Sequence, residues 1–507
     1  MSAVWPKKEW PKEKWPKKRR ELLKDFIALV AGALFPLSLS PFDLWPFALI
    51  SGAALFSLVQ TCSLRRCIQR FYLYNLGMFG VGISWIYVSI HEYGGASMLL
   101  AGFLVVLFVF AYALICVPQS YLFGRYLRNT ELASAIGFCA LWVLQEWVRS
   151  WFLTGFPWLF LGYGVMGTPL EHFAPVTGIF GVSLAAIICS VALWLAISRR
   201  SALMMASPAL VVTLGFGLGQ FEHTESNGHV SVSLIQGNIN QHAKWRPENR
   251  MPIFRHYLQA TSDEWGRDLI VWPEASVTML RENAEAYLVE LAQKGVRSGT
   301  TLVLGIPDTD EAGGLRNTVI ALGNGEGQYV KRRLVPFGEY VPLENFLRGF
   351  IRFFDLPMSR NTPGTRHQLP LLAGNLRLST SICYEVVYPN LVRSTLASPD
   401  LLLTVSNDTW FGRSIGPWQH LQMARMRALE NGRSLVRATN NGVTAIINHR
   451  GRLISKLPQF EVGVLRGDVE IRTGTTPFHQ LGSTPILVLC LLMSGLAAIW
   501  AVSNRRE

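Results

Sequence analysis

The stretch Leu376–Tyr388, which reads LRLSTSICYEVVY, alternates apolar and polar side chains over its first residues and changes character at Cys383. Alternation with a period of two is typical of a strand with one buried face. Cys383 follows this strand directly, at the position where α/β folds place their reactive groups. We therefore interpret the stretch as a strand that carries a cysteine into a site, with a buried structural cysteine as the alternative.

The distribution of the cysteines favours a reactive role for Cys383. The other six lie in or beside long apolar segments, at Cys62, Cys67, Cys116, Cys139, Cys189 and Cys490. Cys383 is the only cysteine in the large polar part of the chain, so it has no disulfide partner there. This usage also argues against a disulfide scaffold or a zinc site, and we expect no metal and no cofactor.

The composition indicates a membrane protein. Of the 507 residues, 50% are hydrophobic and only 16% are charged, whereas soluble domains contain roughly 25% charged residues. Much of the net charge of +13 comes from short connections and the N-terminus, and no basic groove with interleaved aromatic residues suggests a nucleic acid partner. Residues 1–25 begin with W-P-K units, and we expect a basic cytoplasmic arm attracted to anionic lipid.

Eight apolar segments are predicted to cross the membrane, although the first two are shorter than the ~20 residues of a full crossing and could form one re-entrant element. They are Phe26–Leu39, Leu44–Val59, Phe71–Ile90, Met98–Val117, Leu132–Val148, Val176–Ile197, Leu203–Leu218 and Ile486–Val502. Basic residues gather at both ends of the chain and in every second connection. The positive-inside rule therefore places both termini in the cytoplasm and residues 220–483 on the outer side.

The chain divides into four parts: the arm (1–25), seven spans (26–219), an extramembrane domain (220–483), and a last span with a short tail (484–507). In the extramembrane domain, short apolar runs alternate with amphipathic segments, which predicts a layered α/β fold with helices on its outer faces. We expect strands at Val230–Ile235, Leu269–Trp272, Leu302–Ile306, Thr318–Leu322, Leu376–Ser381, Leu401–Val405, Ser434–Ala438 and Val443–Ile447.

Three helices are predicted in the same domain, at Pro252–Trp265, Asn283–Arg297 and Trp418–Asn431. In the third helix, the spacing of the apolar residues predicts one buried face, formed by Leu421, Met423, Met426 and Leu429. Arg425 and Arg427 of this helix are expected to remain in water.

Two more polar residues stand where apolar runs end. Glu274 follows the run LIVWP, and Lys331 follows GQYV in a segment that also carries Glu339. Read alone, Glu274 could be a solvated carboxylate and Lys331 one member of a solvated Lys-Arg-Arg cluster. Together with Cys383 they could form a nucleophilic site, because Glu274 could accept the thiol proton and Lys331 could stabilise an oxyanion. The domain also holds eight histidines, so a Cys-His pair remains open.

The runs LIVWPEAS, YVKRRLVPFGEYVP and SICYE, in this order, resemble the Glu-Lys-Cys motifs of the nitrilase (carbon-nitrogen hydrolase) superfamily. With the apolar segments around them, the resemblance narrows to the apolipoprotein N-acyltransferase family. The segments Gln236–Trp245 and Asn407–Arg433 are similar to that family as well. The resemblance implies about eight transmembrane helices and an extramembrane α-β-β-α sandwich.

The resemblance also implies roles for single residues. Glu274 would be the general base, Lys331 the oxyanion-stabilising lysine and Cys383 the nucleophile. Further matching positions would shape or orient the site, at Glu339, Tyr384 and Glu385, and Trp245 would border the entrance of an acyl chain. Apolar residues in nearby loops would be lids, lipid contacts or ordinary anchors, at Trp410, Phe411, Phe346, Phe350, Phe353 and Phe354.

The implied reaction transfers a fatty acyl chain from a membrane phospholipid, with phosphatidylethanolamine expected as the donor, through a cysteine thioester. The acceptor would be the α-amino group of the diacylglyceryl-cysteine of an apolipoprotein. The expected location is the bacterial inner membrane, with a periplasmic catalytic domain in a monomeric enzyme. One alternative is a membrane-tethered nitrilase-type amidase, in which water resolves the thioester. Another is a membrane receptor or transporter with an inactive enzyme-like domain.

Overall fold

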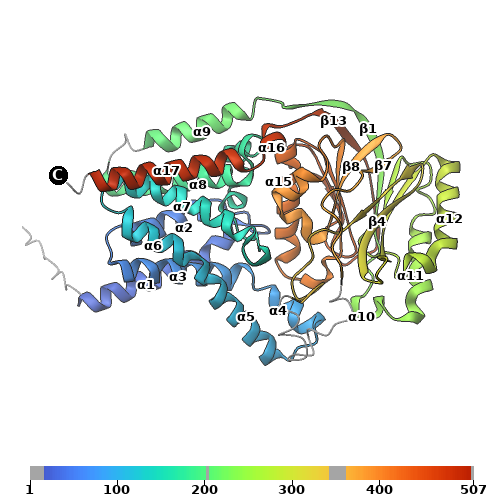
Figure 1. The fold of residues 1–507 in the computed structure, drawn as a ribbon, viewed down its shortest axis with the longest axis horizontal. Helices are drawn as coiled ribbons and strands as arrows, with labels where there is room; N and C mark the ends of the chain where they lie inside the picture. The colour runs from blue at the N-terminus through green and yellow to red at the C-terminus, as the bar shows by residue number, and fades with distance from the viewer. Residues whose placement is uncertain (1–15, 201–204, 342–360, 504–507) are drawn as a thin grey trace, which may run out of the picture.

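The computed structural model describes residues 16–200, 205–341 and 361–503. Figure 1 shows a bundle of helices at one end of the molecule and two β-sheets at the other. The W-P-K units before Pro16 lie outside the described residues, as do Phe346, Phe350, Phe353 and Phe354, so the expectations for them remain predictions.

Helices occupy all eight predicted apolar segments. They are α1 (Lys17–Leu34), α2 (Pro46–Val59), α3 (Leu64–Gly82), α5 (Met98–Ala113), α7 (Glu131–Arg149), α8 (Ala174–Arg199), α9 (Ala206–Leu218) and α17 (Thr484–Ser503). The short helices α4 (Ile86–Val88) and α6 (Val117–Tyr126) follow α3 and α5. In Figure 1, α7, α8 and α17 run side by side in this bundle.

Length and composition identify fewer membrane spans than the sequence patterns predict. Among the described residues, three helical stretches are long and apolar enough to cross a membrane, at Met98–Tyr126, Pro169–Arg199 and Thr484–Ser503. The bent pair Leu64–Gly82 and Ile86–Tyr93, with 58° between its parts, would be a fourth. Helices α2 and α9 are apolar but shorter. The helical region therefore holds three or four candidate spans.

Helices α1 and α3 approach each other closely because glycines lie at their contact. A Cβ atom added to Gly32 would lie 1.9 Å from the carbonyl oxygen of Tyr74, and one added to Gly77 would lie 2.1 Å from that of Leu29. Small residues allow such contacts between apolar helices. Arg70 of α3 is buried and binds Asp25 of α1 (Nε–Oδ1, 3.0 Å), which joins the two helices by a charge pair as well.

The other end of the molecule is a sandwich of two sheets. The first has the order β13-β1-β2-β3-β4-β6 and the second the order β12-β11-β10-β9-β8-β7-β5. The strands of the two sheets are β1 (Thr224–Gln236), β2 (Leu269–Val271), β3 (Thr301–Thr309), β4 (Leu315–Gly323), β5 (Gly325–Glu326), β6 (Gln328–Val330), β7 (Leu371–Ala373), β8 (Leu376–Ile382), β9 (Leu401–Ser406), β10 (Leu435–Thr439), β11 (Ala445–Ile447), β12 (Leu453–Lys456) and β13 (Gly463–Gly474).

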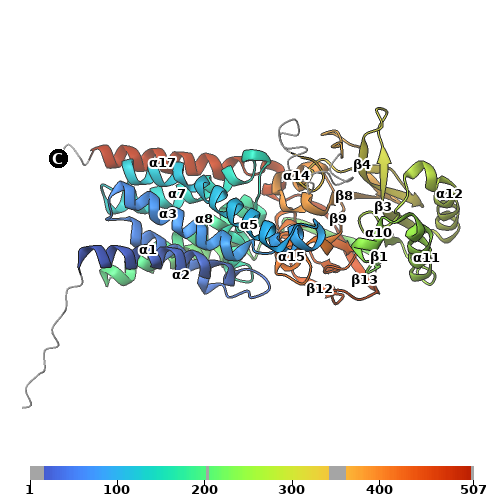
Figure 2. The same cartoon turned by 90° about the horizontal axis from the view of Figure 1, so that it is seen from below.

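Helices cover both outer faces of the sandwich. Helices α11 (Arg250–Ala260) and α12 (Arg281–Ser298) pack on the first sheet, at the end farthest from the helical bundle. Helices α14 (Pro389–Thr395) and α15 (Gly416–Asn431) lie on the second sheet, on the side of the bundle. Figure 2 shows α15 between the strands and the bundle, and its buried residues share one core with the helices of the bundle. The predicted layered α/β sandwich is therefore confirmed.

The eight predicted strands are present and so are the three predicted helices, although β1 begins six residues before its predicted start and α11 ends five residues before its predicted end. The prediction for Arg427 is wrong. Arg427 is fully buried and pairs with Glu430 (Nε–Oε2, 2.8 Å), because this face of α15 packs on the bundle rather than facing water. Arg425 is partly exposed, as expected, and the four apolar residues predicted for the buried face of α15 are buried.

Candidate active site

Cys383 lies where β8 ends and a short 3₁₀ turn, Cys383–Val387, begins. Its φ of +52° is in the left-handed region, which residues with a side chain rarely adopt. Two residues later, the buried Glu385 accepts the N–H of Ile382 through Oε2 (2.8 Å). Its other oxygen accepts the N–H groups of Arg332 (2.7 Å) and Arg333 (3.1 Å). Glu385 thus ties the cysteine turn to the segment that follows Lys331.

Lys331 lies between two carboxylates. Its Nζ is 2.8 Å from Oε1 of Glu339 and 3.3 Å from Oε1 of Glu274, and its side chain is almost completely buried. The amide of Asn317, on β4, donates to the same two oxygens, at 2.7 Å for Glu274 and 3.3 Å for Glu339. The two carboxylates are therefore held around one ammonium group by contacts from three parts of the chain.

Glu274 follows β2 in a tight turn. Its Oε2 accepts the backbone N–H of Asn407 (2.8 Å), which comes directly after β9. The turn passes so close to β3 that a Cβ on Gly305 would lie 2.5 Å from the amide nitrogen of Ala275, so the position requires glycine. The ends of strands from both sheets thus meet at Glu274, which is where parallel α/β sheets commonly form sites.

The charges around Cys383 determine its resting state. Burial and the neighbouring Glu274 raise the pKa of the Cys383 thiol well above its usual range, and Lys331 opposes them only in part. Burial lowers the pKa of Lys331, but Glu339, Glu274 and Cys383 together raise it above that of a free lysine. The site at rest therefore holds a protonated thiol beside an ammonium group, and attack by sulfur requires a base.

A second buried lysine lies next to Glu274. The Nζ of Lys244 donates to the carbonyl oxygen of Glu274 (3.3 Å) and lies 5.9 Å from the ring centre of Trp245. Burial lowers the pKa of Lys244 to about 8, although Glu274 partly offsets this effect. Trp245 is partly exposed beside it, and its role at an acyl-chain entrance stays a prediction.

Tyrosines after Cys383 reach the loop that follows α7. The hydroxyl groups of Tyr384 (3.1 Å) and Tyr388 (2.9 Å) both donate to the carbonyl oxygen of Gly155. Phe411, after β9, packs edge-on against Trp85 with ring centres 4.7 Å apart, and Ser89 donates to the carbonyl oxygen of Trp410 (2.7 Å). The residues around the cysteine are therefore anchored on the helical bundle.

The imidazole nearest to the cysteine belongs to His420 of α15. Its Nε2 contacts the carbonyl oxygen of Cys383 (3.1 Å) and not the thiol. This geometry does not support a Cys-His pair in which histidine takes the thiol proton. Among the described residues, no group of three or more His, Cys, Asp or Glu side chains could hold a metal ion.

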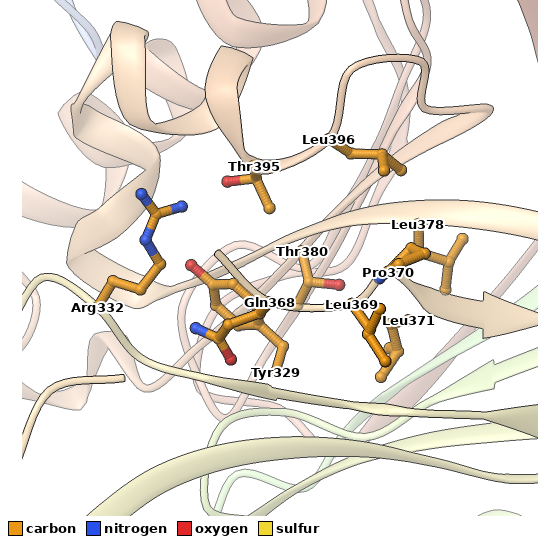
Figure 3. Close-up of a pocket in the computed structure, with 10 residues that line it drawn as sticks. All are labelled: Tyr329, Arg332, Gln368, Leu369, Pro370, Leu371, Leu378, Thr380, Thr395 and Leu396. Carbon is orange, nitrogen blue, oxygen red and sulfur yellow. The ribbon is translucent and has the colours of Figure 1, made fainter. Parts of the chain in front are cut away.

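Figure 3 shows the residues that line a small cavity between β6, β8 and the segment Gln368–Leu371. Its volume of about 10 Å³ is enough for one water molecule at most. The hydroxyl of Tyr329, which lines the cavity, donates to Glu385 (3.1 Å). The cavity thus lies against a tyrosine that supports the cysteine turn, and it is too small for an acyl chain.

Sequence reasoning missed several residues of the site. His420 and Asp408, whose Oδ1 lies 3.0 Å from Nδ1 of His420, lie inside the segment Asn407–Arg433. Lys244 directly precedes Trp245, so the segments that carry the resemblance contain all three. Asn317 lies within β4 and gives no signal of its own, because the pairing of β4 with β3 and β6 brings it to the carboxylates.

Comparisons with known proteins agree along almost the whole chain. A family model of the apolipoprotein N-acyltransferase N-terminal domain matches residues 31–192, and one of carbon-nitrogen hydrolases matches residues 231–476. The apolipoprotein N-acyltransferase of Pseudomonas syringae pv. tomato is 45% identical over 94% of this chain and 97% of its own. That of Vibrio cholerae serotype O1 is 38% identical over 96% of this chain and 98% of its own.

Among solved structures, a carbon-nitrogen hydrolase from Helicobacter pylori G27 covers 49% of this chain and 90% of its own, with 15% identity and a TM-score of 0.37. The sequence matches alone establish the relationship, because both halves of the chain match and the full-length relatives align from end to end. The chain therefore belongs to the apolipoprotein N-acyltransferase family, and it is an acyltransferase.

Proposed function

We propose that this enzyme transfers a fatty acyl chain from a membrane phospholipid to an apolipoprotein through a thioester on Cys383. The acceptor is the α-amino group of a diacylglyceryl-cysteine, and phosphatidylethanolamine is the proposed donor. The observation that carries the proposal is the buried Lys331 ammonium group, held between Glu274 and Glu339 beside a protonated thiol at a strand end. This is the arrangement that acyl transfer through a cysteine needs.

The first half of the reaction forms the thioester. The sulfur of Cys383 attacks the ester carbonyl carbon while Glu274 accepts the thiol proton. The ammonium group of Lys331 stabilises the oxyanion of the tetrahedral intermediate. When the carbon–oxygen bond breaks, the leaving oxygen takes the proton from Glu274, and a lysophospholipid departs. Contacts from Asn317 and Glu339 keep the side chains of Glu274 and Lys331 in position during this exchange.

The second half returns the enzyme to its resting state. The free α-amino group attacks the thioester carbonyl carbon, and Glu274 accepts the proton that the nitrogen loses. The carbon–sulfur bond breaks, and the sulfur takes this proton to become a thiol again. The products are an amide on the lipoprotein and free Cys383, so no cofactor is consumed and the atoms balance.

We infer that residues 26–219 and 484–507 form the membrane part and residues 220–483 the catalytic domain, on the periplasmic side of the bacterial inner membrane. Eight crossings with both termini in the cytoplasm satisfy the distribution of basic residues. Because both substrates are anchored in lipid, a site held at the membrane avoids moving an acyl chain into water, at ~0.8 kcal/mol per CH₂ group. We propose a monomer that acts on these two membrane-bound partners.

Product analysis tests transfer against hydrolysis. The purified enzyme is incubated with phosphatidylethanolamine that carries a labelled acyl chain, with and without a diacylglyceryl peptide. The proposal predicts labelled N-acyl peptide, and little labelled free fatty acid in either reaction. Free fatty acid as the main product, formed at the same rate without peptide, would contradict transfer and support the amidase alternative.

A further inference from the structure

We propose that His420 is a positioning residue for the nucleophile: its Nε2–H donates to the carbonyl oxygen of Cys383 and holds the cysteine backbone in its left-handed conformation. The buried pair of Asp408 and Arg437 fixes the orientation of the imidazole ring. This inference rests on the proposed role of Cys383 and adds a residue that acts through it.

Contacts connect the carbonyl oxygen of Cys383 through His420 to Asp408 and Arg437, which also contact each other. Nε2 of His420 lies 3.1 Å from the carbonyl oxygen of Cys383, and Nδ1 lies 3.0 Å from Oδ1 of Asp408 and 3.0 Å from Nη2 of Arg437. The same Nη2 donates to Oδ2 of Asp408 (2.6 Å), and the hydroxyl of Ser406 donates to Oδ1 (2.6 Å). The side chains of His420, Asp408 and Arg437 are all buried.

Each member comes from a different element of the second sheet or its covering helix. Asp408 follows β9, Arg437 lies on β10 and His420 lies on α15. Strand β9 pairs with both β8, which leads to Cys383, and β10. The network therefore joins the nucleophile turn to two neighbouring strands and to the helix that covers them.

The protonation of the ring follows from its neighbours. A carbonyl oxygen can only accept, so Nε2 of His420 must carry a proton. Burial and Arg437 lower the pKa of His420, which favours a neutral ring whose single proton is on Nε2. Nδ1 is then free to accept from Arg437, and Asp408 acts through Arg437 because a carboxylate oxygen cannot donate to Nδ1. Burial opposes ionisation of Asp408, but its contacts with Arg437 and Ser406 favour the carboxylate, and the pKa of this carboxyl is lowered below its usual range.

The backbone of Cys383 needs such a restraint. A non-glycine residue at φ of +52° is strained by roughly 1–3 kcal/mol and persists only when its surroundings hold it. The carbonyl group of Cys383 turns with this backbone, so fixing the carbonyl oxygen also fixes the direction of the Cα–Cβ bond. A displacement of the sulfur by ~1 Å can reduce a reaction rate about 100-fold.

His420 is itself held by contacts with the helical bundle. Its neighbour on α15, Gln419, donates to the carbonyl oxygen of Gly82 at the end of α3 (3.0 Å) and accepts the indole N–H of Trp158 (2.8 Å). Arg427, two turns along α15, lies 3.3 Å from the hydroxyl oxygen of Tyr163. Helix α15 thus connects the position of Cys383 to the membrane part of the molecule.

A pair of amide substitutions tests the proposal. In His420→Gln, the side-chain amide nitrogen can take the place of Nε2 and still donate to Cys383. In His420→Asn, the amide nitrogen reaches only the place of Nδ1, so the donor to Cys383 is lost. Both variants keep a polar, uncharged side chain, and they differ mainly in where the N–H group lies.

The readout is the burst of acyl-enzyme, followed by intact mass after rapid mixing with phospholipid. The amplitude of the burst counts folded, competent sites, whereas its rate constant reports how the nucleophile is placed. We expect His420→Asn to lower the rate constant roughly 10- to 100-fold with an unchanged KM for phospholipid. His420→Gln should remain within about fivefold of the wild type.

Three results would overturn the inference: equal rate constants in all three proteins, equal losses in both variants, or a loss in His420→Asn confined to the amplitude. An absence of acyl-enzyme in the wild type would instead contradict the proposed function. The two failures are therefore distinguishable.

Discussion

At the scale of single residues, the distribution of protons between Glu274, Lys331 and Cys383 decides whether the enzyme can react. Burial and Glu274 keep the proton on the thiol, and Glu339 and Glu274 keep the proton on the lysine. In the proposed mechanism, Glu274 accepts the thiol proton when sulfur attacks. Glu339 has a different task, since it contacts Lys331 more closely than Glu274 does (2.8 Å against 3.3 Å).

Matched substitutions can distinguish the role of Glu274 from that of Glu339. We expect Glu274→Gln to slow thioester formation by about 10²- to 10⁴-fold, the usual contribution of a general base. Glu339→Gln removes a charge-assisted contact but leaves the base, so a loss of roughly 10- to 100-fold is expected. Burst kinetics of both variants measure these effects. A Glu274→Gln variant that acylates at the wild-type rate would rule out Glu274 as the base.

Lys244 makes a pH-dependent contribution to stability. Its folded pKa of about 8 lies below the ordinary value of 10.5, so between these pH values the unfolded chain binds more protons and stability rises with pH. The cost of the buried charge is full below pH ~8, at roughly 3 kcal/mol at most. Lys244→Met should therefore raise the melting temperature at pH 7, and this gain should shrink by pH 10.

The control for this comparison is Lys294→Met, which changes an exposed lysine on α12. A general effect of pH on lysine-to-methionine variants would appear in this variant as well. Melting curves of the detergent-solubilised proteins give the difference at each pH. If the effect of Lys244→Met is the same at both pH values, Lys244 does not titrate in this range in the folded protein.

At the level of secondary structure, β8 and α15 position the site. The sequence predicts β8 and its end at Cys383, but it does not predict the burial of the polar face of α15. The alternation in Leu376–Tyr388 predicts β8 and the position of Cys383 at its end, because a half-buried strand imposes a period of two. The polar face of α15 could not be predicted in the same way. Arg427 is expected in water on local grounds, and only the docking of α15 on the bundle buries it beside Glu430.

Strand β13 shows a second limit of local patterns. It is mostly polar or partly exposed and has the sequence GVLRGDVEIRTG, so no apolar run marks it. Its existence depends on eleven paired positions with β1, at the edge of the first sheet. Pairing partners that lie more than 200 residues apart in the chain leave no trace in either segment alone.

The contact between α1 and α3 leads to a stability prediction with a control on the same helix. Gly77→Ala would place a Cβ 2.1 Å from the carbonyl oxygen of Leu29, whereas the position of a Cβ on Gly80 is open. We expect Gly77→Ala to cost about 1–3 kcal/mol through overpacking. Gly80→Ala should be neutral or gain up to ~1 kcal/mol from helix propensity.

Melting temperatures of the two glycine variants in detergent measure this difference. Equal melting temperatures for Gly77→Ala and Gly80→Ala would show that α1 and α3 separate at no cost, and the close packing of the two helices would then be wrong.

At the scale of the whole molecule, the catalytic sandwich rests on the helical bundle through contacts that also reach Cys383. Tyr384 and Tyr388 bind the carbonyl oxygen of Gly155, and Glu430 accepts the N–H of Ile179 (2.8 Å) where α8 is kinked at Gly178. Sequence patterns predict both parts of the molecule, because apolar runs and strand alternation are local. They do not predict these contacts, which join segments distant in the chain.

The proposed orientation of the two parts can be tested with single added cysteines. Glu311→Cys, in an exposed turn of the sandwich, should react with a membrane-impermeant maleimide added to intact spheroplasts. Arg65→Cys, at the predicted cytoplasmic end of α3, should react only after the membrane is opened. The wild type, with its seven native cysteines, gives the background. Reaction of Arg65→Cys in intact spheroplasts would contradict cytoplasmic placement of that end.

We propose that Cys383 carries the acyl chain. The most direct measurement is the intact mass of the purified protein after incubation with phospholipid, for the wild type and for Cys383→Ala, before and after hydroxylamine. We expect a fatty-acyl adduct on the wild type that hydroxylamine removes and that a diacylglyceryl peptide discharges as N-acyl peptide. Cys383→Ala should show no adduct. An adduct that persists in Cys383→Ala, or none on the wild type, would show that Cys383 does not carry the acyl chain.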